Sequence, residues 1–315
     1  RVVFTEADQL DVLKAAHSVL EEGIAQPILL GREKTIKELM QTIEFDEEVP
    51  IIDPKKDSEQ AIRVTYADLF WEAQKRQGRT LYDAERLMRE RNYFGAMMVV
   101  NGDADAMISG YSRNYPQVVR PILEIVGKHL GTKRVAATNL MLTERGPIFL
   151  SDTTINVEPN AKELAKIAYM TAQTMNFFGI TPVMAMLSFS NFGSSEFPQA
   201  KKVKEAVSFL HRSYPEIDVD GPVQSDFALN KEMLNDRFAF STLNRKKVNA
   251  LIFPNLDAAN ITYKLLKELN NTLSIGPILM GLQYPIHVLQ LGASVEEIVN
   301  MTAVAVVDAQ QKEKQ

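Results

Sequence analysis

Short apolar runs alternate with segments of helical periodicity along most of the chain. Runs with the length and composition of buried strands occupy residues 2–4, 27–31, 49–52, 96–100 and 106–109. Apolar positions spaced three and four residues apart predict helices over residues 8–22, 34–42, 58–77, 81–91 and 117–130. This alternation is typical of an α/β fold, in which a mostly parallel sheet is covered by helices on both faces.

The pattern changes between Val135 and Val157. Two extended runs flank the segment Thr143-Glu144-Arg145-Gly146-Pro147, which predicts a β-hairpin. The alternation then resumes, with strands expected at 183–188, 248–253 and 277–282 and helices at 160–178, 201–213, 258–270 and 295–310. No segment rich in Gly, Ser and Pro marks a linker, so we expect two parts between which the chain crosses more than once.

Composition narrows the classes of protein to which the chain can belong. Its 315 residues suggest two domains, and a net charge of −5 argues against a nucleic-acid-binding surface. No apolar run is long enough to span a bilayer. Cysteine is absent, which excludes thiolate metal sites and cysteine nucleophiles, and the four histidines are too widely spaced to suggest zinc. These properties fit a cytoplasmic protein without a metal of its own.

The first candidate site is the polar loop after the strand expected at 183–188. Its candidate ligand-binding residues are Ser188, Ser190, Asn191 and Gly193. Hydroxyls, an amide and a glycine at the carboxyl end of a strand can form a cradle for an anion. A polar loop that caps the helix near Pro198 is an equally good interpretation.

Two further loops carry weaker signals. In residues 220–228, two aspartates and a glutamine flank a Gly-Pro turn, and a turn with side-chain caps is the favoured interpretation. After the strand that ends at Phe253, Asp257 is expected to cap the next helix. Asn255 and Asn260 remain candidates for contact with a ligand.

Charged residues near the middle of the first half form the last group of candidates. Asp103 and Asp105 could bind a metal or exchange protons, but carboxylates at a strand entry are more often simply solvated. Arg113 and Arg120 are the better candidates, because a site that receives a polyphosphate needs cations.

The segment from Pro277 to Ile298 resembles the C-terminal signature of phosphotransacetylases. It reads Pro-Ile-Leu-Met-Gly-Leu, and later Leu-Gln-Leu-Gly-Ala-Ser-Val-Glu-Glu-Ile. In that family the matching turn carries Ser-Arg-Gly-x-Ser and ends in a carboxylate. The arginine steadies acetyl phosphate, and the carboxylate takes the proton from the thiol of coenzyme A.

The chain departs from the family pattern within this turn. Gln290 stands at the serine position and Leu291 at the arginine position, while Ser294 is kept. Glu297 keeps a carboxylate at the aspartate position and is assigned as a vestigial base. Leucine has neither charge nor donor for a phosphoryl group, and losing such an electrostatic group typically costs ~100- to 1000-fold in rate.

Other segments resemble the same family in order along nearly the whole chain. They are Arg1–Glu6, Pro27–Gly31, Ser109-Gly110, Arg120-Pro121, Asp152 with Asn156, Ser188–Ser194, Asp220–Asp226, Phe253–Asn260 and Gly276–Gly281. Two more positions depart from the pattern: the family's helical arginine falls at Gln74, and a small polar residue falls near Tyr115. The resemblance therefore implies a phosphotransacetylase scaffold whose chemistry has been removed.

This combination is similar to the phosphotransacetylase-like C-terminal domain of large bacterial NADP-dependent malic enzymes. In those proteins an N-terminal domain oxidises and decarboxylates malate, and the C-terminal domain senses acetyl-CoA. The run Ser190–Ser194 and the Gln-Leu-Gly turn carry this likeness, and a first residue that is Arg1 rather than methionine agrees with a segment of a longer protein. Without a Gly-x-Gly-x-x-Gly fingerprint, we expect no cofactor in this chain. NADP and a divalent metal would belong to the malic enzyme domain.

The resemblance implies two α/β domains around a cleft, in the architecture of phosphotransacetylases and of isocitrate and isopropylmalate dehydrogenases. We expect the first domain at 1–131 plus 280–315 and the second at 132–279. The cleft would bind acetyl-CoA as an allosteric effector. The expected partners are an N-terminal malic enzyme domain and further copies of the chain in a homo-oligomer, with no nucleic acid or membrane.

Two alternatives remain open. One is an active phosphate acetyltransferase, which converts acetyl-CoA and phosphate to acetyl phosphate and CoA with Glu297 as base and another cation in place of the lost arginine. The other is a purely structural module that holds a malic enzyme together as an oligomer. Release of thiol from acetyl-CoA would distinguish the first alternative from the regulatory interpretation.

Overall fold

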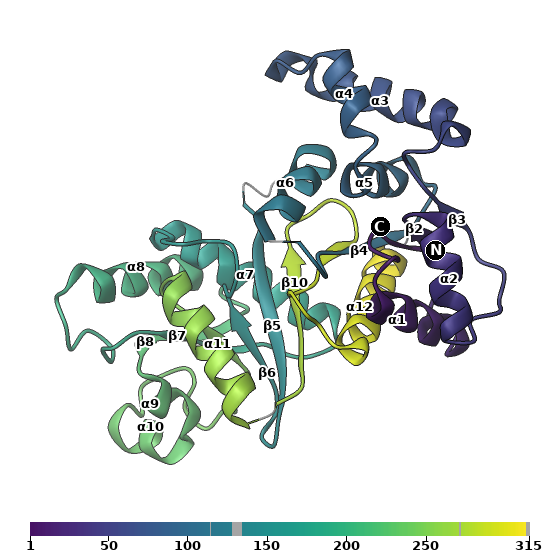
Figure 1. Cartoon of the computed structure of the whole chain (residues 1–315). Coiled ribbons are helices and arrows are strands. Elements are labelled where there is room, and N and C mark those ends of the chain that lie inside the picture. The colour runs from purple at the N-terminus through teal and green to yellow at the C-terminus, as the bar shows by residue number, and fades with distance from the viewer. Residues whose placement is uncertain (114, 128–133, 271, 313–315) are drawn as a thin grey trace. The chain divides into compact units, whose positions relative to one another are not determined.

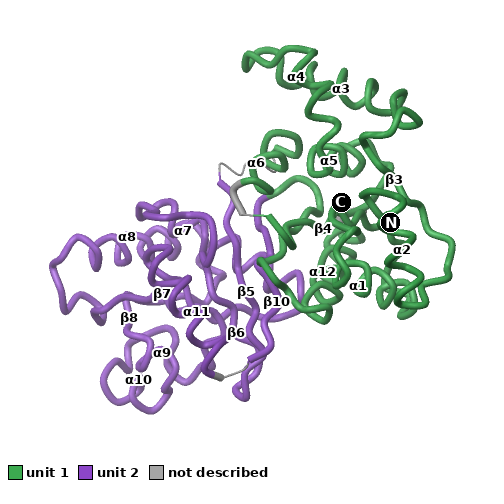
Figure 2. The backbone as a smooth tube through the Cα atoms, viewed as in Figure 1, with its two compact units in different colours: residues 1–132, 282–315 green, residues 133–281 purple. Residues whose placement is uncertain are grey.

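The computed structural model describes the chain except for residues 114, 128–133, 271 and 313–315. It divides into two compact units, coloured separately in Figure 2. Unit 1 comprises residues 1–132 and 282–315, and unit 2 comprises residues 133–281. The expected domains 1–131 plus 280–315 and 132–279 stay a prediction about independently folding parts.

Unit 1 is built on a parallel sheet with strand order β11-β4-β1-β2-β3. The strands are β1 (Val2–Phe4), β2 (Pro27–Leu30), β3 (Ile51–Ile52), β4 (Ala106–Ser109) and β11 (Ile286–Val288). The residues of β1, β2, β4 and β11 are buried. Short, continuously apolar strands are what a parallel sheet covered on both faces requires.

The helices of unit 1 surround this sheet (Figure 1). They are α1 (Leu10–Glu21), α2 (Glu33–Thr42), α3 (Gln60–Gln74), α4 (Leu81–Leu87), α5 (Arg91–Asn101), α6 (Tyr115–Val126) and α12 (Val295–Lys312), with short 3₁₀ turns η1 (Asp57–Glu59) and η2 (Lys75–Gln77). Helix α12 packs on α1 although they come from opposite ends of the chain. Helix α3 packs on α4 and on α5, and the α3–α4 pair projects beyond α5.

The strand predicted at 96–100 is wrong, because these residues lie in α5. Every residue from Asn92 to Val99 is buried, so α5 has apolar residues on all sides and lacks the alternation that identifies a helix. Gly102 ends the helix in a left-handed conformation, with φ of 84°. The strand predicted at 106–109 is confirmed as β4.

Unit 2 is built on a mixed sheet with strand order β10-β5-β6-β9-β7-β8. The strands are β5 (Ala136–Thr143), β6 (Gly146–Ser151), β7 (Val183–Leu187), β8 (Asp218–Val223), β9 (Ala250–Ile252) and β10 (Ser274–Met280). Strands β5 and β6 form the predicted hairpin, and β10 pairs with β5 in the antiparallel sense. Strands β6, β9, β7 and β8 are parallel, so their carboxyl ends meet at one edge.

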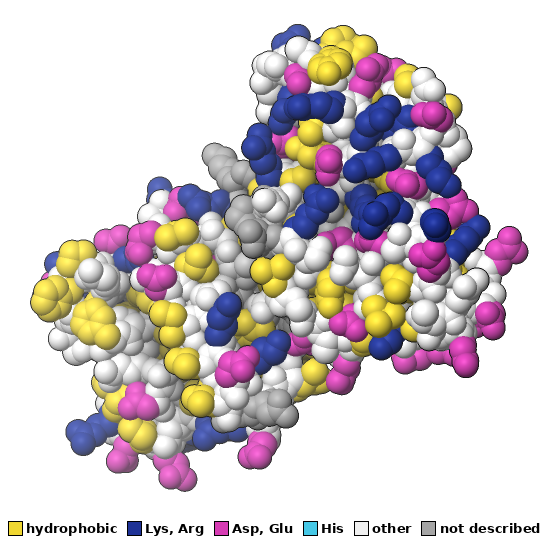
Figure 3. Space-filling view, viewed as in Figure 1, with side chains coloured by type: hydrophobic (Ala, Val, Ile, Leu, Met, Phe, Trp, Pro, Cys, Tyr) yellow, Lys and Arg dark blue, Asp and Glu magenta, His cyan; other side chains and the backbone are white. Residues whose placement is uncertain are grey.

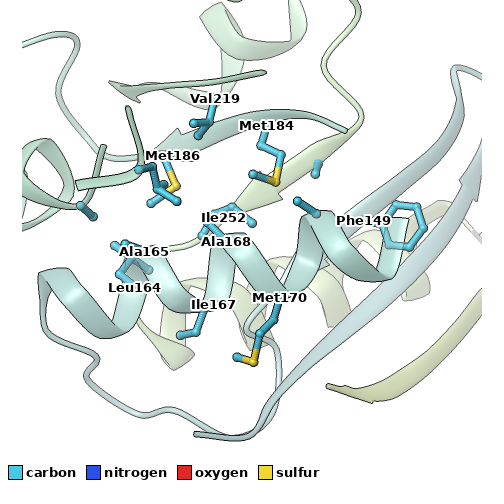
Figure 4. Close-up of a cluster of buried hydrophobic side chains, with 14 of the residues drawn as sticks. Phe149, Leu164, Ala165, Ile167, Ala168, Met170, Met184, Met186, Val219 and Ile252 are labelled. Atoms are coloured by element: carbon cyan, nitrogen blue, oxygen red, sulfur yellow. The ribbon is translucent and has the colours of Figure 1, made fainter. Parts of the chain in front are cut away.

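Five helices accompany this sheet. They are α7 (Ala161–Phe177), α8 (Pro198–Ser213), α9 (Ser225–Leu229), α10 (Lys231–Arg237) and α11 (Leu256–Asn270). In Figure 4, α7 directs Ala168 toward the strands that carry Met184 and Ile252, while Ile167 and Met170 point to its opposite side. Burial of α7 on both sides anchors it in the core of unit 2.

The predicted α/β class is confirmed, with one local error in unit 2. Residues 220–228, interpreted as a turn with side-chain caps, lie in β8 and α9. The Gly221-Pro222 pair suggested a turn, but β8 is the edge strand of its sheet, and proline is tolerated in an edge strand. Asp220 is buried there and accepts hydrogen bonds from Ser241 Oγ and Thr242 N.

Candidate functional site

A loop at residues 110–113, hereafter the 110–113 loop, leaves the carboxyl end of β4 in unit 1. Its backbone is fixed by the buried carboxylate of Glu6, which accepts hydrogen bonds from the N–H groups of Gly110 (2.7 Å), Tyr111 (2.7 Å) and Ser112 (3.1 Å). The Ser112 hydroxyl also donates to Glu6, at 2.5 Å. Glu6 was not among the predicted site residues, although a carboxylate two residues after a buried strand was the available signal.

Buried hydroxyls tie the same strand ends together. Thr5 Oγ1 donates to Ser109 Oγ at 2.7 Å, and Ser109 Oγ donates to Asn92 Oδ1 at 2.8 Å, which links β1, β4 and α5. Gly110 then turns the chain with φ of 92°, and a Cβ there would lie 2.6 Å from Val288 Cγ1. Glycine is therefore needed for the close approach of β4 to β11.

The predicted ligand-binding arginines of unit 1 are exposed and paired with carboxylates. Arg113 lies 3.4 Å from Glu90, and the Arg120 side chain is 72% exposed with its Nε donating to Glu124 at 2.8 Å. Glu124 also accepts from Arg79 Nη2 at 2.7 Å and from the Tyr93 hydroxyl at 2.8 Å. To contact a phosphate, Arg120 must leave Glu124 or share its guanidinium between Glu124 and the phosphate.

These contacts change the acidity of the groups around Glu124. Burial by itself would raise the pKa of Glu124, but the hydrogen bonds from Arg120 and Tyr93 hold that pKa below its ordinary value. Burial and the hydrogen bond to Glu124 raise the pKa of Tyr93 to about 12. Glu124 is therefore ionised at neutral pH and lowers the positive potential beside Arg120.

The turn after β11 places the remaining unit 1 candidates. Ser294 and Glu297 form a capping box at the start of α12: Ser294 N donates to Glu297 Oε2 at 2.9 Å, and Glu297 N donates to Ser294 Oγ at 3.2 Å. Leu291 is 59% exposed, and the backbone oxygen of Gln290 accepts from Ala293 N. The structure gives Glu297 a helix-capping role, and its role as a vestigial base stays a prediction.

In unit 2 the candidates after β7 lie in residues 188–194, hereafter the 188–194 loop. Asn191 Nδ2 donates to Gln224 Oε1 at 2.6 Å, and Gln224 N donates to Asn191 Oδ1 at 2.8 Å. This reciprocal pair joins the loop to the segment after β8. The Asn191 side chain therefore holds the loop in place, and this uses only one of the two N–H groups of Nδ2.

The serines of the 188–194 loop are also engaged with one another. Ser190 Oγ lies 3.0 Å from Ser194 Oγ, and Ser188 Oγ accepts from Ser190 N at 3.4 Å. Gly193 has φ of 96°, so its left-handed conformation explains a glycine there without a ligand. A side chain at Gly193 would come within 3.6 Å of Lys204 Nζ, which places a cation near the loop.

Two sequence interpretations change with the structure. Asn255, not Asp257, caps α11, because Asn255 Oδ1 accepts from Ala258 N at 3.0 Å. Asp105 is not simply solvated, because its Oδ1 accepts a hydrogen bond from the Arg1 guanidinium at 2.8 Å. Asp103 accepts a hydrogen bond from the Tyr66 hydroxyl.

Within the described residues, no group of three or more His, Asp or Glu side chains could hold a metal ion. No helix in the described part of the chain is long and apolar enough to cross a membrane.

A family profile described as "Phosphate acetyl/butaryl transferase" matches residues 1–306. The chain belongs to this family. It is 34% identical to the phosphate acetyltransferase of Clostridium acetobutylicum, over 98% of this chain and 94% of the relative. Solved phosphotransacetylases from Staphylococcus aureus and Streptococcus pyogenes superpose with TM-scores of 0.87, at 30% and 34% identity and over at least 98% of this chain and 93% of theirs.

The chain is also similar to malic enzymes. It is 38% identical to the NADP-dependent malic enzyme of Escherichia coli (strain K12), over 98% of this chain but only 41% of the enzyme. The family match, and the coverage of 94% and 95% of the lengths of two phosphate acetyltransferases, support the acetyltransferase alternative better than the regulatory interpretation. The likeness to isocitrate and isopropylmalate dehydrogenases stays a prediction.

Proposed function

We propose that this member of the phosphate acetyl/butaryl transferase family transfers the acetyl group of acetyl-CoA to inorganic phosphate. The observation that carries the proposal is the match of the family over residues 1–306, together with relatives named phosphate acetyltransferase that the chain covers almost completely. The groups in the two candidate loops are of the kinds that bind phosphate: arginines in unit 1, and hydroxyls and backbone N–H groups in unit 2.

In the proposed reaction a phosphate oxygen attacks the thioester carbonyl, the carbon–sulfur bond breaks, and the CoA sulfur leaves with a proton. Arg120 neutralises charge on the phosphate after exchanging its Glu124 contact for the ligand. Glu297 is the carboxylate assigned to take the proton of the attacking phosphate and pass it to the leaving CoA sulfur, at the cost of its hydrogen bond to Ser294 N. Arg113 provides a second cation close to the turn after β4.

A second candidate function is favoured by the exposed hydrocarbon of Leu291. At the position where the resemblance expects arginine, this side chain offers no charge to a phosphoryl group. Arg120 also donates a hydrogen bond to Glu124, which partly neutralises its charge. In this proposal the chain binds acetyl-CoA without turnover, as an effector-binding and oligomer-forming domain of an NADP-dependent malic enzyme in the cytoplasm. Several relatives of 35 to 38% identity carry that name or its NAD-dependent form.

One assay separates the two candidates. The chain is incubated with acetyl-CoA in phosphate buffer, and free CoA thiol is followed with a thiol-reactive dye. Because the sequence contains no cysteine, the protein contributes no background. Phosphate-dependent release with k about 1 s⁻¹ or faster supports the acetyltransferase. Binding of acetyl-CoA by calorimetry without thiol release rejects turnover and supports the effector-binding domain.

A further inference from the structure

A pocket with a volume of about 280 Å³ lies in unit 1, outside the residues proposed for acetyl transfer. Its charged lining consists of Arg32, Lys55, Arg89, Arg91, Asp8 and Asp53. Four cations against two carboxylates leave a surplus of two positive charges, in a chain whose net charge is −5. In Figure 3, Lys and Arg side chains gather on the face of unit 1 turned toward the viewer.

Three of these cations make no direct contact with an acidic group in the described part of the chain, although Arg32 acts on Asp8 at longer range. Among the described residues, the side chains of Arg32, Lys55 and Arg89 make no hydrogen bond and no ion pair. Arg91 differs, because its guanidinium binds Asp8 through two hydrogen bonds of 2.7 Å. Burial by itself would raise the pKa of Asp8, but Arg91 holds it below its ordinary value, so this pair stays ionised and fixed.

The backbone around the pocket also favours an anion. Arg32 is the N-cap of α2 and Arg91 is the first residue of α5, and neither helix has a side-chain hydrogen bond at its N-cap. Cations at helix N-termini oppose the helix dipole, whereas an anion there is stabilised by it. Glu33 offsets this only partly, because Lys37 and Lys56 engage its carboxylate.

The fold builds the pocket from segments far apart in the sequence. Arg32 follows β2, Lys55 follows β3, and Arg89 precedes α5, so three separate connections converge at the carboxyl side of the parallel sheet. This is the edge at which open α/β sheets bind ligands. The volume lies just below the ~300 Å³ at which small-molecule pockets typically begin, which suits a small anion or one end of a larger molecule.

We propose that this pocket is a binding site for a phosphate group, held by Arg32, Lys55 and Arg89 and oriented by the fixed Arg91–Asp8 pair. Arginine side chains bind phosphate oxygens in pairs of parallel hydrogen bonds, and lysine adds a point charge. The phosphate could come from a free anion or from the phosphate end of a coenzyme. The pocket lies outside the residues proposed for acetyl transfer, and phosphate binding there does not require turnover.

Binding of pyrophosphate, measured by titration calorimetry at constant ionic strength, tests the site. The wild-type chain is expected to bind it saturably, with Kd at about 1 mM or below. Arg32→Gln with Arg89→Gln removes two unpaired cations and is expected to weaken binding about tenfold per arginine. Lys34→Gln with Arg76→Gln removes the same charge from exposed positions of unit 1 outside the pocket lining, and is expected to leave Kd within about twofold.

Absence of saturable binding in the wild type, or equal weakening by both double variants, overturns the proposal. Circular dichroism of the variants confirms that they are folded. Titration with CoA and with dephospho-CoA then identifies the source of the phosphate. A loss in the pocket variant that is seen only with CoA assigns the site to the coenzyme's 3′-phosphate, and unchanged CoA affinity assigns it to a free anion.

Discussion

At the carboxyl end of β4, the 110–113 loop is held by the side-chain carboxylate of Glu6. At the carboxyl end of β7, the 188–194 loop is held by neutral amide and hydroxyl groups. Glu6 gathers three backbone N–H groups and a hydroxyl around one carboxylate. Asn191 and Gln224 exchange two neutral hydrogen bonds, and Ser190 contacts Ser194. The two loops occupy equivalent places at the ends of parallel strands and reach a fixed conformation by different chemistry.

This difference determines how each loop responds to its surroundings. A buried carboxylate with several donors is expensive to remove, because every donor loses its partner at once. Neutral amide and hydroxyl bonds each contribute less and do not depend on pH. The 110–113 loop therefore depends on one charged group, Glu6, and the 188–194 loop depends on several neutral ones.

Replacing Arg120, a cation on α6 of unit 1, is expected to have the largest effect on function. Under the acetyltransferase proposal, Arg120→Ala lowers kcat/KM for phosphate by ~100- to 1000-fold, because a positive charge on the phosphate is lost. Ser190→Ala, in the 188–194 loop, removes only a neutral hydroxyl and is expected to cost about tenfold or less. The thiol-release assay measures both, and Arg86→Ala serves as a control on exposed α4. Equal effects of the Arg120 and Ser190 changes would break the comparison.

The largest effect on stability is expected at Glu6. Glu6→Ala leaves three backbone N–H groups without an acceptor and lowers the free energy of unfolding of unit 1 by about 3 kcal/mol or more. Glu6→Gln keeps one acceptor oxygen and is expected to lose about half as much. Urea unfolding followed by fluorescence reports unit 1 specifically, since Trp71 is the only tryptophan of the chain. A loss below about 1 kcal/mol for Glu6→Ala would show that water replaces the carboxylate.

The ion pair between Asp8 and Arg91 in unit 1 is expected to contribute to stability in a pH-dependent way. The pKa of Asp8 is lowered in the folded chain, so its pairing with Arg91 stabilises above the ordinary pKa of 3.8 and is lost as pH falls through the folded value. Asp8→Asn is expected to cost about 2 kcal/mol at pH 7, and the difference from wild type should shrink below about pH 4. Trp71 fluorescence in urea at several pH values measures it. A cost that stays constant with pH would indicate that the pair acts through packing alone.

The smallest effect is expected in the neutral loop. Asn191→Ala is expected to cost about 1 to 2 kcal/mol of unit 2 stability, with the same value at pH 4 and pH 8. Gln224→Ala removes the acceptor of Asn191 Nδ2 and the donor to Phe189 O, and should cost a similar amount. The double variant should cost less than the sum, because both changes remove the same Asn191 Nδ2–Gln224 Oε1 hydrogen bond. Scanning calorimetry provides the measurement. Additive costs would mean that the two amides act independently.

The fold could be predicted where apolar residues recur at a regular helical or strand spacing, or where Gly and Pro mark a turn or a helix end. The hairpin of β5 and β6 followed from Gly146-Pro147 between two extended runs, and α7 followed from its amphipathic spacing up to Gly179. The prediction for α5 failed because the helix is buried on all sides, so its apolar residues show no helical periodicity. The prediction for β8 failed because a Gly-Pro pair indicates a turn more often than an edge strand.

The sequence predicted which residue types lie in the candidate site, but not the groups to which their side chains bind. Asn255 and Asn191 were recognised as polar groups after strands, yet one caps α11 and the other binds Gln224. The contact between Arg120 and Glu124 could have been inferred, because a spacing of four residues places side chains together on a helix. The pocket with Arg32 and Lys55 could not, since tertiary structure alone brings these connections together.

The order of segments in unit 1 has a consequence for how the chain is made. The sheet of unit 1 begins with the strand at the very start of the chain, but β11 and α12 follow only after residue 281. Until the ribosome has delivered residues 286–288, β4 is an unpaired edge open to other strands. All of unit 2 is synthesised in that interval, so its hairpin and helices can fold first, and the 110–113 loop gains its contacts with Val288 and Gly292 only afterwards.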